Sequence, residues 1–364
     1  PARRRARGHV VKPRGGVRRN AGGVEQRNKM ANITEVTTPD GLAEALQNAD
    51  GGDTVEVTGD LGQVSLQDIR PDRPVTVVGG ADSHFERLEM RRCANLRWSG
   101  LSFWPHDPGA GRDGSGKPRK GRSYLLTADQ ASENIEVSNS VFRGRKDSDN
   151  HAMWTEADWD EARVSALQLR GQGCVVRSNI AVGVNFGFVV AGRSSELFDN
   201  VVFGFSGDGL RVAESNCVVI GNQITDAIQI DGNHPDAIQI YSSTGPIQGL
   251  VIKDNLIVEW TVRPDNPLRA KLQGLGLHNG PYRDVVIRDN RIACSSYHGI
   301  RVNRTENLEI TGNRVRHIDG LRGKFPRIQI SNCTGNVVVA NNEAELFIPD
   351  LGRTNREPNY RQAL

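Results

Sequence analysis

The sequence predicts an all-β protein: a single right-handed parallel β-helix of about 9–11 coils, preceded by a capping helix and a basic arm. Two observations predict this fold. A motif built around Asn recurs along the chain, and a short strand of alternating apolar residues lies upstream of each copy. By length alone, a chain of 364 residues would form two or three domains, but repeat folds break that rule.

The recurring motif has apolar residues, then a small or acidic residue, then Asn, then an apolar residue two positions later. It is read in segments such as VVRSNIAV, VVIGNQI and VIKDNLIV. Its conserved spacing puts one Asn in each coil, at Asn179, Asn200, Asn222, Asn255, Asn290, Asn313 and Asn342. At a tight turn inside a coil, we expect these amides to bond to the backbone and to one another, forming a ladder.

The upstream strands keep a regular distance from the Asn motif. They begin at residues 166, 187, 209, 237, 274, 299 and 327, and the first three lead their Asn by 13 residues. The lengths vary mainly after the Asn, which indicates a coil of about 22 residues with insertions at one corner. A β-sandwich with Asn-rich turns would not preserve this spacing.

The start of the repeat divides the chain into four parts. We expect a basic arm at 1–29, a cap at 30–60, coils at 61–348 and a tail at 349–364. In the cap, Thr38 has the character of a helix N-cap, Pro39 fits the first turn, and 54–57 alternates like a strand. No second helix is expected. The coils carry loop insertions at 104–123, 144–165, 226–236 and 259–273.

The pentapeptide DAIQI occurs twice, at 226–230 and 236–240. Only the second copy lies in the register of the upstream strands, which places Asp236 and Gln239 on their outward face. The first copy begins four residues after Asn222, too soon for a whole coil. We therefore expect it to form the third strand of its coil and part of a rim loop.

Aligning the upstream strands brings polar side chains onto one face of one sheet. The set comprises Asp208, Asp236, His298, Arg211, Gln239, Arg301, Tyr241 and His278. Insertions bordering this face carry Lys271, Trp154 and Trp159. A polar groove with aromatic side chains suits a sugar chain. The two Trp side chains either stack on a glycan or hold down their own loop.

Two carboxylates on adjacent coils suggest chemistry. Asp208 and Asp236 would push their pKa values apart and give the acid and base of glycoside hydrolysis. The alternative is β-elimination from a uronic acid. Asp208 and Asp236 would then hold Ca²⁺, and Arg301, Arg211, His298 or Lys271 would be the base. The hydrolase needs no cofactor. For a single Asp before a strand, ordinary turn chemistry would explain the residue equally well.

The cap helix followed by GGDTVEV, together with the Asn ladder, resembles the pectate-lyase-like superfamily of right-handed parallel β-helices over residues 33–348. That fold hosts lyases, hydrolases, epimerases and non-catalytic spikes. SGDG at 206–209 and YHGIRV at 297–302 resemble elements of polygalacturonase-type hydrolases, although their Asp-Asp and Arg-x-Lys elements are missing. The resemblance implies Asp208 and Asp236 as acid and base, supported by His298 and Arg301.

The net charge of +3 conceals a split, because residues 1–29 carry ten Lys or Arg against Glu25. Their local charge of +9 leaves −6 for the other 335 residues. We expect the arm to be disordered when alone in water and to dock on an acidic protein partner. Nucleic acid is expected to bind only through this arm. Alternatively, Met30 is the natural start and the arm is upstream sequence.

No run of 18 apolar residues predicts a membrane span, and no segment resembles a secretory signal. The five scattered cysteines are expected to be reduced. These features favour a protein made in the cytoplasm that reaches a virion or cell surface by assembly, as trimeric tailspike depolymerases do. The leading prediction is an enzyme that cleaves an acidic polysaccharide, by hydrolysis before elimination. The rival is a non-catalytic, receptor-binding virion spike.

Overall fold

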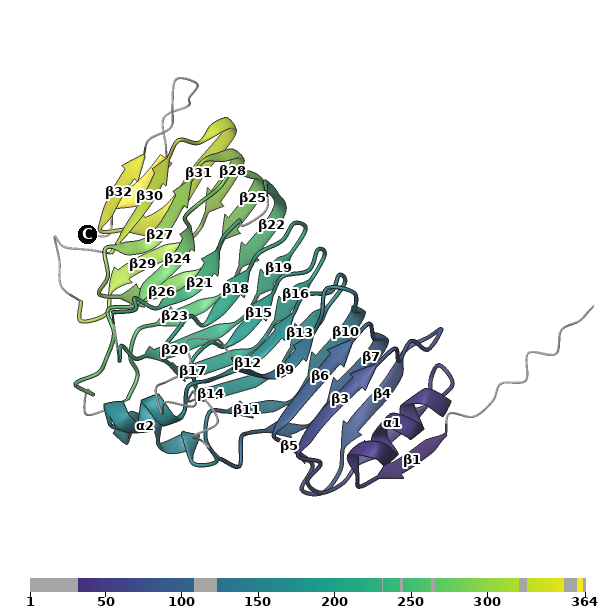
Figure 1. The fold of residues 1–364 in the computed structure, drawn as a ribbon. Coiled ribbons are helices and arrows are strands. Elements are labelled where there is room, and N and C mark those ends of the chain that lie inside the picture. The colour runs from purple at the N-terminus through teal and green to yellow at the C-terminus, as the bar shows by residue number, and fades with distance from the viewer. Residues whose placement is uncertain are drawn as a thin grey trace, which may run out of the picture. The chain divides into compact units, whose positions relative to one another are not determined.

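The computed structural model describes residues 32–107, 123–230, 232–242, 245–262, 266–320 and 326–349, and the backbone of 359–362. These residues form a stack of coils that runs from α1 (Pro39–Asn48) to β32 (Leu346–Pro349), as Figure 1 shows. Every pairing between the described strands is parallel. The predicted arm, most of the 104–123 insertion and most of the C-terminal tail lie outside the described residues.

Each typical coil contributes three strands, which stack into three columns. The first column is the 11-stranded sheet: β3 (Gln63–Gln67), β6 (Arg87–Arg91), β9 (Ser123–Ala128), β12 (Val164–Leu169), β15 (Phe188–Val190), β18 (Leu210–Val212), β21 (Asp236–Ile240), β24 (Gln273–Leu277), β27 (His298–Asn303), β30 (Arg327–Ser331) and β32. The other two columns together form a 22-stranded sheet.

The second column begins at the cap and runs the length of the stack: β1 (Ile33–Val36), β2 (Thr54–Val57), β4 (Val75–Gly79), β7 (Ala94–Ser99), β10 (Glu133–Ser138), β13 (Val175–Arg177), β16 (Glu196–Phe198), β19 (Val218–Ile220), β22 (Ile247–Lys253), β25 (Tyr282–Arg288), β28 (Thr305–Thr311) and β31 (Thr334–Ala344). Strand β33 (Asn359–Gln362) pairs with the end of β31.

The third column follows the turn after each second-column strand, a turn that carries the ladder Asn from Asn179 onward: β5 (His84–Phe85), β8 (Ser102–Phe103), β11 (Val141–Arg143), β14 (Ile180–Val184), β17 (Val201–Phe205), β20 (Gln223–Ala227), β23 (Leu256–Val258), β26 (Arg291–Cys294) and β29 (Arg314–His317). The predicted fold, a single parallel β-helix, is confirmed.

Apolar side chains stack inside the coils in register with the strands. One ladder in the first column is Leu169, Val190, Val212, Ile240, Leu277, Val302 and Ile330, all fully buried. Burying such a side chain stabilises the fold by about 1.5–3 kcal/mol relative to exposing it. A shift of one residue would turn this ladder to solvent, so the core fixes which side chains face outward.

The predicted Asn ladder is present. The side-chain amide of each Asn donates to the Oδ1 of the next, from Asn179 to Asn200 at 3.1 Å and on to Asn342 at 2.9 Å from Asn313. The residue before each ladder Asn has a left-handed backbone, as at Asp199 (φ 51°) and Gly221 (φ 70°). This conformation makes the tight turn and explains the Gly, Asp, Asn or Ser found there.

The N-terminal cap matches its prediction. Helix α1 starts after Thr38, whose Oγ1 accepts a hydrogen bond from the backbone N–H of Gly41 at 3.1 Å. Leu42 and Leu46 are buried in the core of the coils. Strand β1, which pairs with β2, was not predicted because its four residues precede any recognisable repeat.

The expectation of no second helix is wrong. Within the 144–165 insertion, Ser148–Met153 is a 3-10 helix and α2 (Glu156–Glu161) is a short α-helix. Helix α2 is held by a capping box, in which the Thr155 hydroxyl accepts from the N–H of Asp158 and the Asp158 carboxylate accepts from the N–H of Thr155. No described helix is long and apolar enough to cross a membrane.

The duplicated pentapeptide is split as predicted. The second copy is β21, in the first column. In the first copy, Asp226 and Ala227 end β20 of the third column, and Ile228 then forms an isolated bridge with Arg269 in the 259–273 insertion. The two copies therefore occupy different columns of the same stack.

Candidate functional site

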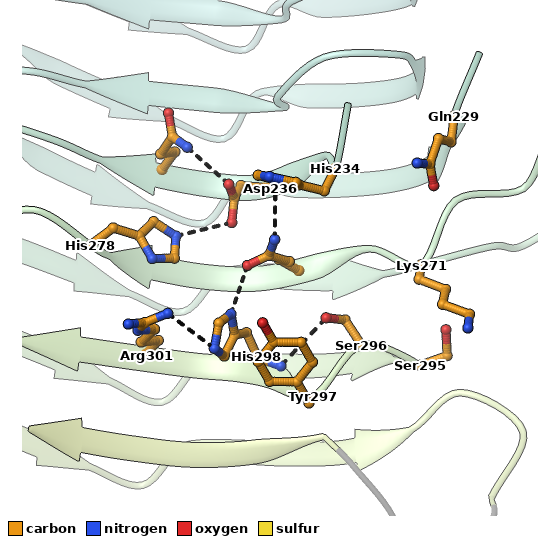
Figure 2. Close-up of a pocket in the computed structure, with 12 residues that line it drawn as sticks. Gln229, His234, Asp236, Lys271, His278, Ser295, Ser296, Tyr297, His298 and Arg301 are labelled. Carbon is orange, nitrogen blue, oxygen red and sulfur yellow. Dashed lines mark hydrogen bonds and ion pairs between the residues drawn. The ribbon is translucent and has the colours of Figure 1, made fainter. Parts of the chain in front are cut away.

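A cavity of about 750 Å³ lies over three consecutive strands of the first column, β21, β24 and β27. Figure 2 shows the residues around it. The strands contribute outward-facing polar side chains, and the segments that precede the strands contribute the rim. The lining comprises Gln229, His234, Asp236, Gln239, Lys271, Gln273, His278, Ser295, Ser296, Tyr297, His298 and Arg301.

Strand register explains this grouping. Asp236 is the partner of Gln273, and the pairing of Leu275 with Ile300 sets Gln273 beside His298. The next outward row has Gly276 between Gln239 and Arg301. A Cβ at Gly276 would lie 2.1 Å from Nε2 of His278, so the missing side chain lets that imidazole fold over the sheet.

Asp236 is the centre of the upper part of the cavity, although only 1% of its surface is exposed. Its Oδ2 accepts a hydrogen bond from the Gln239 amide at 2.9 Å, and its Oδ1 lies 3.3 Å from Nε2 of His278 (Figure 2). The buried carboxylate thus holds two side chains of the cavity in place. Because each partner comes from a different outward row, Asp236 ties the rows together.

His298 belongs to a chain of hydrogen bonds that fixes its tautomer. Its Nδ1 lies 2.8 Å from Oε1 of Gln273, which can only accept, so Nδ1 carries the proton. Its Nε2 then accepts from Nη1 of Arg301 at 3.3 Å. The Gln273 amide nitrogen lies 3.3 Å from Nδ1 of His234.

Burial, reinforced by the positive charge of Arg301 and by His278, lowers the pKa of His298 to about 3. The imidazole is therefore neutral at physiological pH, and its unprotonated nitrogen is Nε2. A neutral imidazole with an oriented lone pair can accept a proton, and it becomes a stronger base when an anion neutralises Arg301 and the pKa rises.

The buried carboxylate of Glu259, which was not among the predicted site residues, links two segments at the rim of the cavity. Glu259, 1% exposed, accepts hydrogen bonds from the backbone N–H of Leu272 at 3.1 Å and of Ser295 at 2.6 Å. It also forms an ion pair with Arg269 at 2.8 Å. Glu259 therefore joins the segment that carries Lys271 to the segment that precedes β27. In the sequence it looked like an ordinary polar residue at a strand end.

Asp208 lies one coil before Asp236, as predicted, but it is not among the residues that line the cavity. Its Oδ2 forms an ion pair with Arg211, and its Oδ1 accepts from the backbone N–H of Asp236 at 3.0 Å. Burial raises the pKa of Asp208. The Arg211 guanidinium contacts two aromatic rings, 4.3 Å from the centroid of Phe186 and 5.7 Å from that of Tyr241.

The structure does not show Trp154 and Trp159 as open stacking surfaces. Both are buried, with 5% and 1% exposed, in a cluster with Trp260, Ile228 and Ile230. Their ring centroids lie 4.9 Å apart in an edge-on arrangement. The two side chains anchor the 144–165 insertion to the coils, which agrees with the second of the two alternatives predicted for them.

The arrangement of Asp208 and Asp236 does not suit Ca²⁺. All four carboxylate oxygens already have protein partners, and the positive charge beside Asp208 is already supplied by Arg211. A Ca²⁺ ion prefers six to eight oxygen ligands. No step of a reaction is therefore assigned to Ca²⁺ here.

Most of the predicted site residues converge. Asp236, Gln239, Lys271, His278, His298 and Arg301 line the cavity. Asp208, Arg211 and Tyr241 form the adjacent ion pair and its aromatic cover instead. Gln273, Tyr297, His234 and the two serines at 295 and 296 were not proposed as site residues. Gln273 was detectable, because it lies in the same outward row as Asp236 and His298.

Comparison with known proteins gives matches only among solved structures. The sequence matches no protein-family description and no curated protein. A surface adhesin of Streptococcus pneumoniae matches with a TM-score of 0.46 at 12% identity, over 84% of this chain and 86% of its own. The A-module of a mannuronan C-5 epimerase from Azotobacter vinelandii also gives 0.46 at 12% identity, over 88% and 92%.

A polygalacturonase from Erwinia carotovora gives a TM-score of 0.42 at 9% identity, over 94% of this chain and 99% of its own. The described strands themselves establish the fold as a parallel β-helix. At these identities and scores, the matches carry no inference about activity. The arguments about function therefore rest on the residues of the parallel β-helix itself.

Proposed function

We propose that the protein binds an acidic polysaccharide in the cavity over β21, β24 and β27 and cleaves it by β-elimination. The observation that carries the proposal is the makeup of the described lining. It contains one carboxylate, Asp236, against two cations, Lys271 and Arg301, and three imidazoles, His234, His278 and His298. Retaining and inverting glycosidases typically need two carboxyl groups at the bond to be cleaved.

The cations account for an acidic substrate. Arg301 is held at the cavity by its hydrogen bond to His298, and the exposed Lys271 stands at the rim. A uronate carboxylate bound by Arg301 would have its negative charge partly neutralised by charge-assisted hydrogen bonds, while Lys271 adds positive charge at the rim. That neutralisation makes the hydrogen on the adjacent ring carbon, C5, more acidic.

His298 supplies the base. Its Nε2 is unprotonated and is occupied only by a weak contact with Arg301 at 3.3 Å. When Arg301 turns to the substrate carboxylate, the lone pair of Nε2 becomes free to accept the C5 proton. The electrons of the C5–H bond form the C4–C5 double bond, and the C4–O4 bond breaks. Tyr297, whose ring lies 3.9 Å from that of His298, donates the proton to the departing oxygen.

The test uses polymannuronate, polyguluronate and polygalacturonate, with reducing ends and the ultraviolet absorbance of unsaturated products measured together. Elimination predicts that both rise. His298→Gln is expected to lower the rate by about 10²–10⁴-fold. The control is Gln168→Ala, which lies in the outward row of Gln239 and Arg301 but three coils before Gln239.

Reducing ends without unsaturated product would overturn elimination in favour of hydrolysis by Asp208 and Asp236. Binding without either product would overturn cleavage in favour of a non-catalytic spike. A full rate in His298→Gln would reject His298 as the base. Virion association, docking through residues 1–29 and trimer formation remain predictions from the sequence.

A further inference from the structure

A second group of polar side chains lies in the first three coils, where the candidate functional site has no residues. Asp60, His84 and His106 bring one ligand atom each to within 4.8 Å of one another, the one such group of three among the described residues. His84 opens β5, Asp60 bridges to it from the preceding coil, and His106 follows β8. The group borders a cavity of about 700 Å³ that Lys146 also lines.

The contacts of the two histidines direct one nitrogen of each toward Asp60. His84 Nδ1 lies 2.9 Å from Asp60 Oδ1, and His106 Nε2 lies 2.7 Å from Asp60 Oδ2. The opposite nitrogens are already engaged as donors. His84 Nε2 lies 2.8 Å from the carbonyl oxygen of Trp104, and His106 Nδ1 lies 2.9 Å from a carboxylate oxygen of Glu86.

This pattern leaves the two contacts with Asp60 without a hydrogen to share. A carbonyl oxygen and a carboxylate oxygen can only accept hydrogen bonds. Each neutral imidazole therefore donates its single N–H to its outer partner, the Trp104 carbonyl or the Glu86 carboxylate. The inner nitrogens then point lone pairs at the lone pairs of Asp60, at hydrogen-bonding distance. A second proton on each ring or one shared metal ion would complete these contacts.

The outer partners favour the metal ion. Histidines that bind a metal usually donate their other N–H to a backbone carbonyl or a carboxylate, which fixes the ring and its tautomer. Trp104 and Glu86 supply one of each. The Trp104 ring also stacks on His84 at 3.7 Å, and the backbone N–H of Gly62 donates to Asp60 at 2.8 Å. Ligand atoms around a tetrahedral Zn²⁺ lie about 3.3–3.4 Å apart. Binding an ion would therefore lengthen the 2.7–2.9 Å contacts to Asp60 and shorten any wider separation within the 4.8 Å group.

We propose that Asp60, His84 and His106 bind a divalent transition-metal ion of the Zn²⁺ class. His84 binds through Nδ1, His106 through Nε2 and Asp60 through a carboxylate oxygen. Two imidazoles and one carboxylate suit Zn²⁺, Co²⁺ or Ni²⁺ better than Ca²⁺ or Mg²⁺, which prefer oxygen ligands. The fourth position faces the cavity and takes water or an anionic group drawn in by Lys146.

The experiment titrates Zn²⁺ into the full chain, free of any histidine tag and dialysed against chelator, by calorimetry. One ion per chain is expected. His106 is half exposed, so His106→Ala removes a ligand without opening the core, and Asp60→Asn removes the carboxylate. Each is expected to weaken binding by at least about 100-fold, and Glu86→Gln by about 10–100-fold.

Asp82→Asn is the matched control, because it removes a carboxylate from the same cavity without touching the group, and it should leave affinity unchanged. Visible absorption of bound Co²⁺ should report four-coordinate geometry, with loss of the signal in His106→Ala. Equal Zn²⁺ uptake by wild type and His106→Ala would overturn the proposal. So would NMR signals showing both histidines doubly protonated in the presence of Zn²⁺, which would mean ion pairs only.

Discussion

His298 shows how neighbouring coils decide the chemistry of one side chain. Its sequence context, a Tyr-His-Gly segment before a strand, identified a polar residue on an outward face. The tautomer comes from Gln273 on the preceding coil, and the low pKa comes from burial and from Arg301 on its own strand. Neither effect is visible in the residues adjacent to it in the chain.

The lowered pKa gives a prediction for the free protein. A histidine in an unfolded chain has a pKa of about 6.5, whereas His298 stays neutral until the pH approaches about 3. Its NMR signals should therefore show no protonation as the pH falls from 7 to 5. Arg301→Gln removes a cause of the shift, so the titration should move upward. A wild-type titration near the unfolded value would contradict this account.

The direction of the pKa shift also determines how His298 affects the stability of the folded protein. Because the unfolded chain binds a proton to this residue below a pH of about 6.5 and the folded chain does not, its contribution favours folding above that pH. The contribution declines as the pH falls from about 6.5 toward about 3.

At the scale of the element, the Asn turn is the unit that holds successive coils together. Asn222 makes contacts in both directions: its amide donates to Asn255 Oδ1 at 3.0 Å and to the Leu197 carbonyl at 3.0 Å, and its Oδ1 accepts from the backbone N–H of Asn200 at 3.0 Å. All of these groups are buried, so none can turn to water instead.

Replacing Asn222 with Ala should therefore leave several buried polar groups without partners. Each such group costs about 1–3 kcal/mol, so we expect the free energy of unfolding to fall by about 2–5 kcal/mol. Urea unfolding of the variant measures this loss. Gln223→Ala, one residue along and exposed, should change it by no more than about 0.5 kcal/mol. Equal values for the two variants would argue against a stabilising ladder.

The elements that could be predicted from the sequence are those that repeat at a regular spacing. Strands of the first column and the ladder Asn residues repeat with a fixed spacing, so each copy supports the interpretation of the others. Helix α2 occurs once, inside an insertion, and depends on a local capping box that has Asp158 at the position where Glu or Gln is usual. A single short element of this kind offers no second copy for comparison.

At the scale of the whole molecule, the positions of outward residues could be predicted but their partners could not. The column of Asp208, Asp236 and His298 follows from register. Whether a member opens into the cavity depends on side-chain packing, and Arg211 with its aromatic cover closes off Asp208. Similarly, Trp154 is buried by residues of later coils, a contact that no local pattern reports.

The N-terminal cap gives a prediction about whether chains associate with one another. Strand β1 pairs only with β2 among the described strands, and within that part of the chain no strand pairs with its other edge. Strand edges of this kind recruit further strands. Helix α1 packs against β1, β2 and β3 and buries Leu42 and Leu46 at this end of the stack.

Replacing both Leu42 and Leu46 with Asp should release the helix, because each buried Leu contributes about 1.5–3 kcal/mol. We expect the exposed end to join other chains, giving larger species by size-exclusion chromatography with light scattering. Gln47→Asp, exposed on the same helix, is the control. An unchanged particle size in the double variant would show that α1 does not protect this end.

The uniform joint between coils also bears on how such a chain evolves. Because Asn179, Asn200 and Asn222 make equivalent bonds to their successors, a duplication or deletion that spans one complete coil would preserve every interface it leaves behind. Gene length can therefore change in whole coils, each moving the two halves of the protein by about 4.8 Å. Natural relatives would then differ in length by steps, and a binding surface could be lengthened without redesigning its neighbours.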